Sequence, residues 1–223
     1  MGLRGPKPKR KEVTWSSDIA YAAGLIATDG SLSIDGRHID LTSKDREQLE
    51  NFMRCIGREV TISTKKGSYS NQVYMRLQLS DVTLYEFFVS IGLTPKKSHT
   101  IGKIIVPDKY FFDFLRGHHD GDGSFHSYFD PRWKNSFMFY LSFISASRAH
   151  VEWIRENITR LAGVQGHFST AQGNCVVQLR YAKKEAIQIL QRMYPTHEVI
   201  CLSRKRLKIE AALRIVGESL PVT

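Results

Sequence analysis

Two aspartates, Asp29 and Asp122, are the residues of this 223-residue chain whose type and spacing best suit chemistry. Each is followed by glycine and closes a nine-residue segment, AAGLIATDG in the first half and LRGHHDGDG in the second. Gly24 and Gly117 occupy the same place in the two segments, at the offset of 93 residues that also relates the aspartates. Carboxylates are hard oxygen ligands, so this repeated pair could hold a divalent cation such as Mg²⁺ if the fold brings the two together.

The residues around the aspartates indicate how they would meet. Small residues recur at four-residue spacing along two expected helices: Ala20, Gly24 and Thr28 in the first, Gly117 and Gly121 in the second. Such stripes allow two helices to pack closely, which would place Asp29 and Asp122 at adjacent C-terminal ends. Two carboxylates there repel each other and face the negative ends of two helix dipoles, and a bound cation would reverse that penalty.

Metal ions held by Asp29 and Asp122 could activate water against a phosphodiester and stabilise the charge on the leaving oxygen. Two such sites, one from each half of the chain, could cut both strands of a duplex. The alternative is that Asp29 and Asp122 merely end their helices, as Asp-Gly pairs often do.

The two halves predict the same order of elements, αββαββα, in an α+β fold. Helices are expected at about 17–28, 44–57 and 82–91, then at about 108–121, 148–162 and 183–193, with a last one at about 203–215. Strands are expected at 31–35, 37–42, 60–65 and 72–80 in the first half, and at 124–129, 137–145 and within 162–170 and 175–183 in the second. Hairpin turns are expected at Asp35-Gly36, 66–70, 130–136 and Gly173-Asn174.

The segments at 22–30 and 115–123 resemble the LAGLIDADG motif, and the resemblance extends from about residue 16 to 215. It is a resemblance to the single-chain, two-repeat LAGLIDADG homing endonucleases. It implies two pseudo-symmetric domains whose antiparallel sheets form a DNA-binding saddle, with the motif helices packed at the domain interface. The implied activity is a sequence-specific double-strand break in a long asymmetric DNA target, as in intron homing. Mg²⁺ or Mn²⁺ would support it, and Ca²⁺ would bind without supporting cleavage.

The same resemblance implies basic residues beside the aspartates, and the matching positions are Lys97 and Lys205. A solvated surface lysine is the alternative for each. Asp40, Gln78 and Arg180 are weaker candidates for the same site.

Three departures from the family pattern matter. The first copy has Ala27 at the sixth motif position, where the second has Asp120, and Ala22 at the first position, where the second has Leu115. Because one copy lacks the aspartate, we expect Asp120 to have a structural role. His118 and His119 replace aliphatic residues, and we expect both to be buried and hydrogen-bonded. The alternative for His118 is a transition-metal site with Asp122, one helical turn away.

The polar faces of the strands carry side chains suited to base edges and phosphates, and a β-ribbon fits the major groove. A plain solvated surface is the alternative. The predicted DNA-binding residues are Ser31, Ser33, Arg37, His38, Asp40, Thr61, Ser63, Lys65, Tyr74, Arg76, Gln78, His126, Tyr128, Arg132, Lys134, Tyr140, His167, Ser169, Gln178 and Arg180.

The net charge of +10 favours a polyanionic partner. Residues 1–14 form a basic segment, expected to be a disordered arm that is either solvated or in contact with DNA. The predicted division is a first domain at 15–100, a linker at 101–107, a second domain at 108–217 and a tail at 218–223.

The expected partner is double-stranded DNA, without a membrane or an obligate protein partner, and the expected state is a monomer. An intracellular location is expected, in a microbial cytoplasm or an organelle. Scattered Cys55, Cys175 and Cys201 indicate reduced thiols and disfavour a zinc site. Two other functions remain open. One is an RNA maturase that keeps the fold and assists intron splicing, and the other is a DNA-binding relative without activity.

Overall fold

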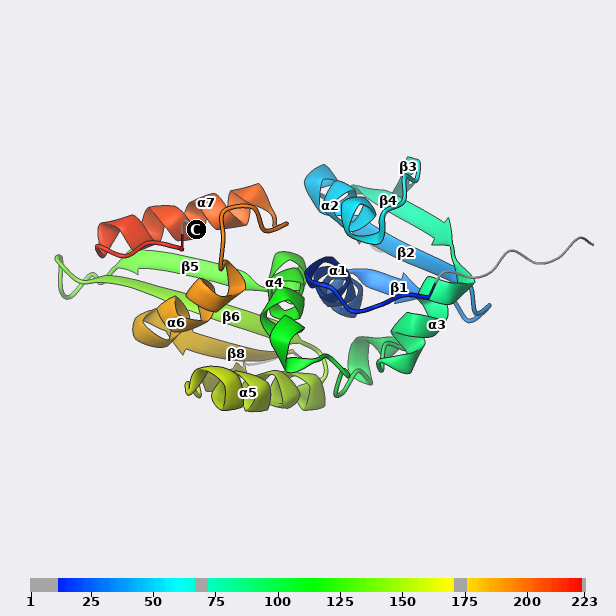
Figure 1. Cartoon of the computed structure of the whole chain (residues 1–223). Coiled ribbons are helices and arrows are strands. Elements are labelled where there is room, and N and C mark those ends of the chain that lie inside the picture. Colours follow the sequence, from blue (N-terminus) through cyan, green and yellow to red (C-terminus); the bar gives the residue numbers. More distant parts are fainter. Residues whose placement is uncertain (1–11, 67–71, 171–175, 222–223) are drawn as a thin grey trace, which may run out of the picture.

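The computed structural model describes residues 12–66, 72–170 and 176–221, which form two similar halves side by side (Figure 1). The helices are α1 Ser17–Thr28, α2 Arg46–Ile56, α3 Val82–Ser90, α4 Phe111–Asp122, α5 Arg148–Ala162, α6 Lys183–Met193 and α7 Ser203–Ile215. The strands are β1 Gly30–Leu32, β2 His38–Ser43, β3 Ile62–Lys66, β4 Val73–Ser80, β5 Ser124–Phe129, β6 Phe137–Ser145, β7 His167–Thr170 and β8 Val177–Ala182. This order confirms the predicted α+β fold of two αββαββα repeats.

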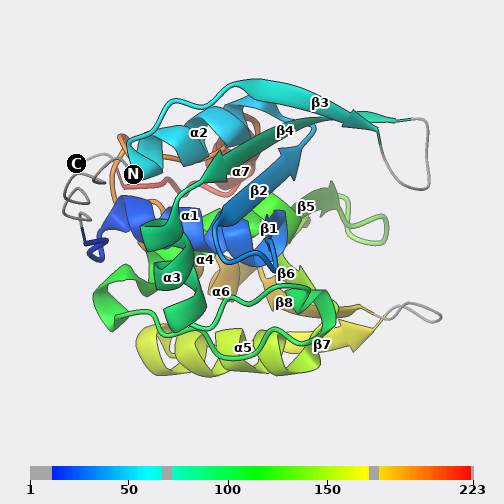
Figure 2. The same cartoon turned by 90° about the vertical axis from the view of Figure 1, so that its right-hand side faces the viewer.

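Each half contains one antiparallel four-stranded sheet with the same topology. The strand order is β1-β2-β4-β3 in the first sheet and β5-β6-β8-β7 in the second. Alternation along β2, where Ile39 and Leu41 are fully buried, directs apolar side chains to the helices and polar ones to the other face. In Figure 2, α2 lies near the top and α5 near the bottom of the molecule, and the loop between β5 and β6 projects to the right.

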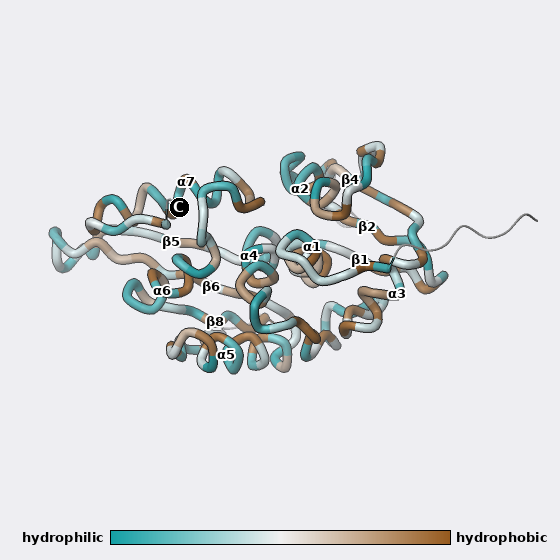
Figure 3. Tube along the Cα trace, viewed as in Figure 1, coloured by the Kyte–Doolittle hydropathy of each residue, from teal (hydrophilic) through white to brown (hydrophobic). Residues whose placement is uncertain are grey.

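The outer helices are amphipathic, and their apolar stripes complete the two cores. Along α5, Val151, Ile154 and Ile158 are fully buried at helical spacing. Figure 3 shows hydrophilic and hydrophobic residues alternating turn by turn along this helix. None of the helices in the described part of the chain is long and apolar enough to span a membrane.

The two halves meet where α1 packs on α4, and glycines set the distance between these helices. A Cβ atom on Gly117 would lie 2.1 Å from the backbone oxygen of Tyr21, and one on Gly24 would lie 2.2 Å from that of Phe114. A Cβ atom on Gly121 would lie 1.9 Å from the Thr28 hydroxyl. These contacts bear out the close helix packing expected from the small residues.

Two elements differ by three residues from one of their predicted bounds, and the others differ by two residues or fewer. The strand expected at 31–35 ends at Leu32, because the side chain of Asp35 accepts the backbone N–H groups of Arg37 and His38 and holds a turn there. The helix expected from residue 108 begins at Phe111, after a 3₁₀ turn at Asp108–Tyr110.

The segments predicted as linker and tail contribute to the core. Ile101 and Ile104 are buried, and Leu220 is only 5% exposed. Of the basic segment at 1–14, only the last residues lie within the described part, where Val13 packs against the core. The predicted turns at 66–70 and 173–174 lie almost wholly outside the described residues.

We expect Gly117→Ala to lower the free energy of unfolding by about 3 kcal/mol, because the added methyl meets helix backbone that cannot yield. Helix propensity alone predicts the opposite sign, a gain of about 1 kcal/mol. Gly102→Ala is the matched control, since a Cβ atom there meets nothing within 4 Å. Urea denaturation of the three proteins measures this, and equal stability of Gly117→Ala and wild type would contradict the packing.

Candidate active site

Asp29 and Asp122 lie at adjacent ends of the two packed helices, as the repeat predicts. Asp29 caps the C-terminus of α1, and Asp122 is the last residue of α4. The carboxylate of Asp29 faces α4, since a Cβ atom on Gly121 would lie 3.3 Å from its Oδ2. Asp29 is half-buried and Asp122 is exposed. The helix packing therefore brings one carboxylate from each half to a common point.

A side chain that the sequence does not single out orients the first carboxylate. Gln48 Nε2 donates to Asp29 Oδ2 at 2.6 Å, and the Ser43 hydroxyl donates to Gln48 Oε1 at 2.8 Å. Within the described residues, no group donates a hydrogen bond to the Asp122 carboxylate. The two halves of the site are thus unequal, with one carboxylate oriented and the other free to take a ligand.

The closeness of the carboxyl groups and their burial change their protonation. Burial raises the pKa of Asp29 to about 6, against the lowering effect of the Gln48 hydrogen bond, and the charge of Asp122 raises it further. Asp122 is more exposed than Asp29, but its partial burial at the packed helix ends also raises its pKa, although Lys205 and Lys97 lower it. Both carboxylates are therefore less stable as anions than in water, which is the condition that a bound cation relieves.

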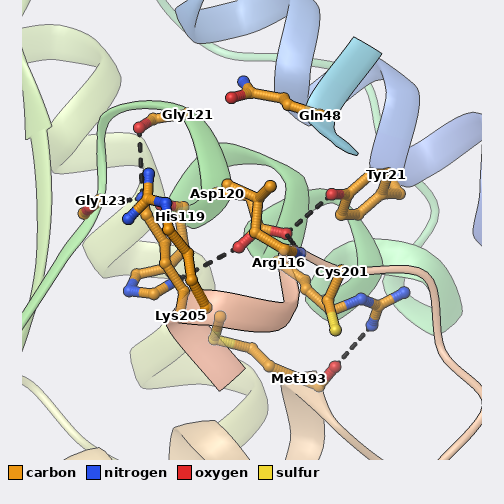
Figure 4. A network of polar contacts seen from close by, with 12 residues as sticks. Tyr21, Gln48, Arg116, His119, Asp120, Gly121, Gly123, Met193, Cys201 and Lys205 are labelled. Atoms are coloured by element: carbon orange, nitrogen blue, oxygen red, sulfur yellow. Dashed lines mark hydrogen bonds and ion pairs between the residues drawn. The ribbon is translucent and has the colours of Figure 1, made fainter. Parts of the chain in front are cut away.

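The two lysines that the resemblance indicates lie beside the aspartates in matching arrangements. Lys97 is 5% exposed, and its Nζ donates to the backbone oxygen of Gly30. The Nζ of Lys205 donates to the oxygen of Gly123 at 2.8 Å and to that of Gly121 at 3.3 Å (Figure 4). Each amine thus binds the glycine that follows the aspartate of its own repeat, so neither is a solvated surface lysine.

Burial governs the charge of both lysines. It lowers the pKa of Lys97 to about 8, although Asp122 and Asp29 raise it. It lowers the pKa of Lys205 to about 8 in the same way, with Asp120 and Asp29 opposing. Near pH 8 each amine can therefore hold or release a proton close to the aspartates.

These residues fit a hard divalent cation such as Mg²⁺. Two carboxylates with raised pKa values converge, and the oxygens of Asp122 accept no hydrogen bond from the described residues. Among those residues, no cluster of three or more His, Cys, Asp or Glu side chains could enclose a metal. Mg²⁺ commonly binds through one or two carboxylates together with water and substrate phosphates, so an incomplete protein shell suits it.

Asp120 ties the two halves together behind the site. Its Oδ2 accepts the Tyr21 hydroxyl of α1 at 2.7 Å (Figure 4). The same oxygen accepts the backbone N–H of Leu202 at 2.8 Å. Arg116, also buried in α4, donates to the backbone oxygen of Met193 at 2.5 Å. These contacts give Asp120 the structural role expected of it. The guanidinium of Arg116 lies 5.6 Å from the centroid of the Tyr21 ring, so Arg116 is a further interface residue that the sequence did not single out.

The histidines of the second motif are buried, as expected, but they are not hydrogen-bonded. His118 and His119 are fully buried, and neither ring has a hydrogen-bond partner among the described residues. The ring of His118 packs instead against Phe114 and His150, with ring centroids 6.2 and 5.3 Å apart. Burial lowers the pKa of His118, so the neutral ring serves as part of the apolar core.

The strand register places most of the predicted DNA-binding residues on the sheet face opposite the helices. In the first sheet, paired residues on this face are Ser31 with Asp40, Asp40 with Gln78, His38 with Ser80, Ser63 with Arg76 and Lys65 with Tyr74. In the second sheet they are His126 with Tyr140, His167 with Arg180 and Ser169 with Gln178, and Tyr128 shares the face two residues after His126. The open faces of both sheets are therefore polar.

Several of these side chains are already paired with one another. Arg76 Nη2 lies 2.5 Å from Asp40 Oδ1, so Asp40 is engaged in the sheet and not at the two aspartates. The guanidinium of Arg180 lies 4.5 Å from the centroid of the Tyr140 ring, and its Nε has no partner among the described residues. These contacts hold the cationic groups on the open face.

A few predicted residues lie outside the strands. Ser33 and Arg37 are in the first turn, and Thr61 directly precedes β3. Arg132 and Lys134 are in the loop between β5 and β6, where Arg132 pairs with Asp130. The structure therefore places these residues at sheet edges and in loops, outside the paired strand residues of the open sheet faces.

Comparison with known proteins agrees with this geometry. Residues 16–92 match the LAGLIDADG-like domain family. A stretch of 119 residues, 51% of the chain, is 31% identical to an A-type ATP synthase subunit from Methanopyrus kandleri, of which it covers 11%. The chain thus spans only about a tenth of that relative.

Solved structures share the fold over most of the chain. The homing endonuclease I-WcaI bound to its DNA recognition sequence matches 92% of this chain and 95% of its own, with a TM-score of 0.61 and 12% identity. I-DmoI in complex with DNA and Mn matches 81% and 98%, with a TM-score of 0.54 and 17% identity. Full-length DUF199/WhiA from Thermatoga maritima matches 92% of this chain and 62% of its own, with a TM-score of 0.57 and 16% identity. The chain therefore has two domains of the LAGLIDADG fold on one polypeptide, and its residues 16–92 match the LAGLIDADG-like domain family.

Proposed function

We propose that this protein is a sequence-specific DNA endonuclease that depends on a divalent metal and makes a double-strand break in a long asymmetric target. The observation that carries this proposal is the convergence of Asp29 and Asp122, each with a lysine amine beside it, at the ends of α1 and α4. Mg²⁺ or Mn²⁺ bound there would activate water and stabilise charge on the phosphodiester. The Mn in the I-DmoI complex supports divalent-metal use.

The side chains of this chain would supply the rest of the chemistry. Asp29 and Asp122 hold the metal, and Gln48 keeps Asp29 in one orientation. Lys97 and Lys205 present ammonium groups that attract the phosphate, and their pKa values of about 8 allow proton transfer at Nζ near neutral pH. Because each lysine serves one repeat, each half would act on one strand.

The open sheet faces would bind the duplex. They carry the amide, hydroxyl and guanidinium groups that recognise base edges and phosphates, and the net charge of +10 favours a polyanion. The DNA-bound LAGLIDADG structures support this role for the shared fold. We further propose that the chain acts as a monomer, because the second repeat already occupies the surface that a partner copy would cover.

A DNA-binding relative without activity is the second candidate. Structures of DUF199/WhiA, whose descriptions name no nuclease, match this chain about as well as the endonucleases do. The fold alone therefore leaves both functions open. The two aspartates favour the endonuclease, because a pair of carboxylates at packed helix ends destabilises the protein unless it binds a cation.

Asp29→Asn and Asp122→Asn should each abolish double-strand cleavage, or leave slow nicking of one strand, because each removes a metal-binding charge. DNA binding should survive, since the sheet faces are unchanged. Cleavage of a target plasmid and a gel-shift assay measure the two effects. Asp18→Asn is the matched control, because Asp18 is an exposed aspartate at the other end of α1. Normal cutting by either active-site variant would remove the basis of the assignment.

The combined contribution of Asp29, Lys97 and Lys205 to the free energy of unfolding without metal should be lowest between about pH 6 and pH 8. The pKa of Asp29 rises from 3.8 to about 6 on folding. Its contribution to the free energy of unfolding therefore falls as the pH rises from 3.8 to about 6. The pKa values of Lys97 and Lys205 fall from 10.5 to about 8, so stability recovers as the pH rises above 8.

Urea denaturation in EDTA at pH 4 and pH 7 separates the contribution of Asp29 from other titrations. The free energy of unfolding of Asp29→Asn, relative to that of wild type, should increase by about 2 kcal/mol from pH 4 to pH 7, because the neutral amide avoids the buried charge. Mg²⁺ should reduce this gain by stabilising wild type. A difference between the two proteins that is the same at both pH values would show that Asp29 is not destabilised as an anion.

A further inference from the structure

Each active-site lysine lies in a segment that is anchored on the opposite half of the molecule. Lys97 follows α3 of the first half and binds the backbone of Gly30 in that same half. Lys205 lies in α7 after the second repeat and binds Gly123 of the second half. The backbone that carries each lysine, however, is held by the second helix of the other repeat. This helix is α5 for the segment of Lys97 and α2 for the segment of Lys205.

The start of α7 is bound by the first turn of α2. The carboxylate of Glu47 accepts the backbone N–H of Ser203 at 3.1 Å and also its hydroxyl proton. Arg204 Nε lies 3.0 and 3.1 Å from the two carboxylate oxygens of Asp45. The N–H of Ser203 opens the helix and has no acceptor within it, so the anion of Glu47 satisfies this donor at the positive end of α7. We call these four side chains the α7 latch.

The segment after Lys97 is bound in a comparable way by the start of α5. The Ser147 hydroxyl donates to the backbone oxygen of Ile101. His150 Nδ1 lies 2.7 Å from the backbone oxygen of Gly102, which requires the Nδ1–H tautomer of the buried ring. Both acceptors lie within five residues of Lys97. The contacts of α2 with the start of α7 and of α5 with the segment after Lys97 are therefore related by the pseudo-two-fold symmetry, although they involve different residue types.

The first turn of α2 serves both halves of the active site. Glu47 binds the helix that carries Lys205, and the next residue, Gln48, donates to Asp29 of the first half. A lysine side chain has a flexible four-carbon stem, so its amine stays on a chosen carbonyl only while the backbone beneath it is fixed. Movement of this turn would therefore disturb the lysine of one repeat and the aspartate of the other together.

We propose that Asp45, Glu47 and Arg204 are positioning residues that place Lys205 in the active site from across the domain interface. Docking of the two domains and assembly of the site are then a single event. The consequence for cleavage rests on the proposed function, whereas the placement of Lys205 does not.

Amine labelling tests the placement without DNA. Purified full-length variants are treated with an acetylating reagent at pH 8, and acetylation of Lys205 and Lys97 is followed by peptide mass spectrometry. The Asp45→Ala/Glu47→Ala protein and the Arg204→Ala protein break the latch from its two sides, with charge changes of opposite sign. In both variants, Lys205 should be acetylated about fivefold faster, which is the change in rate expected on loss of a partly exposed ion-pair network. The acetylation rate of Lys97 should not change. Arg46→Ala/Glu50→Ala is the control, because it removes an ion pair within α2 that does not cross the interface.

An unchanged labelling rate of Lys205, or an equal rise at Lys97, would overturn the proposal. If the Asp45→Ala/Glu47→Ala protein does not fold, Arg204→Ala carries the test by itself. On a cleaved target, the latch variants should accumulate nicked DNA, because cutting by the Lys205 half slows about fivefold more than cutting by the other half. Equal slowing of both strands would contradict the proposal, because it would show that the latch does not act on Lys205 in particular. A wild type that cuts no DNA would refute the proposed function while the labelling result still decides the role of the latch.

Discussion

The close approach of α1 and α4 is the constraint on which the rest of the structure depends. Backbone meets backbone at Gly24 and Gly117, where a single added carbon would lie little more than 2 Å from a carbonyl oxygen of the other helix. Only at this distance do the C-terminal ends of the two helices share one small volume. The two sheets then lie on either side of this axis, each with its polar face open and its apolar face covered by helices.

This packing brings the two carboxylates of Asp29 and Asp122 together, and the surrounding residues offset their repulsion only in part. The amines of Lys97 and Lys205 offset the carboxylates, but burial lowers the pKa of both lysines, so their charge is also disfavoured. Gln48 stabilises only Asp29. A site that holds two anions and two cations, each destabilised by burial, is costly for a structural interface and suited to a ligand that carries positive charge and a polyanionic substrate.

The repeat made most of the fold predictable, because the spacing of the apolar residues and the positions of the turn residues indicate the same elements in both copies. The helix at Arg148–Ala162 and the strand at Phe137–Ser145 match their predicted bounds, and the aspartates meet as their place after the glycine stripes implies. Contacts that cross between repeats were not predictable in this way. Glu47 looks like an ordinary polar residue of an amphipathic helix, and only the docking of the two halves gives it a partner in Ser203. Gln48 looks the same, and only the packing of α2 beside the end of α1 gives it a partner in Asp29. Likewise, the polar type of His118 suggested hydrogen bonds, whereas its depth in the apolar core leaves none among the described residues.

Sequencing of cut ends tests the central claim, that the two converging carboxylates form one metal-dependent site for both strands. Wild-type protein would be incubated with a plasmid library of random inserts in Mg²⁺ or in EDTA, and both ends of every break would be read. The account predicts breaks in both strands, at a fixed offset within one recurring asymmetric sequence, and only with Mg²⁺. Breaks that persist in EDTA, or an absence of breaks above background in Mg²⁺ and Mn²⁺ alike, would contradict it.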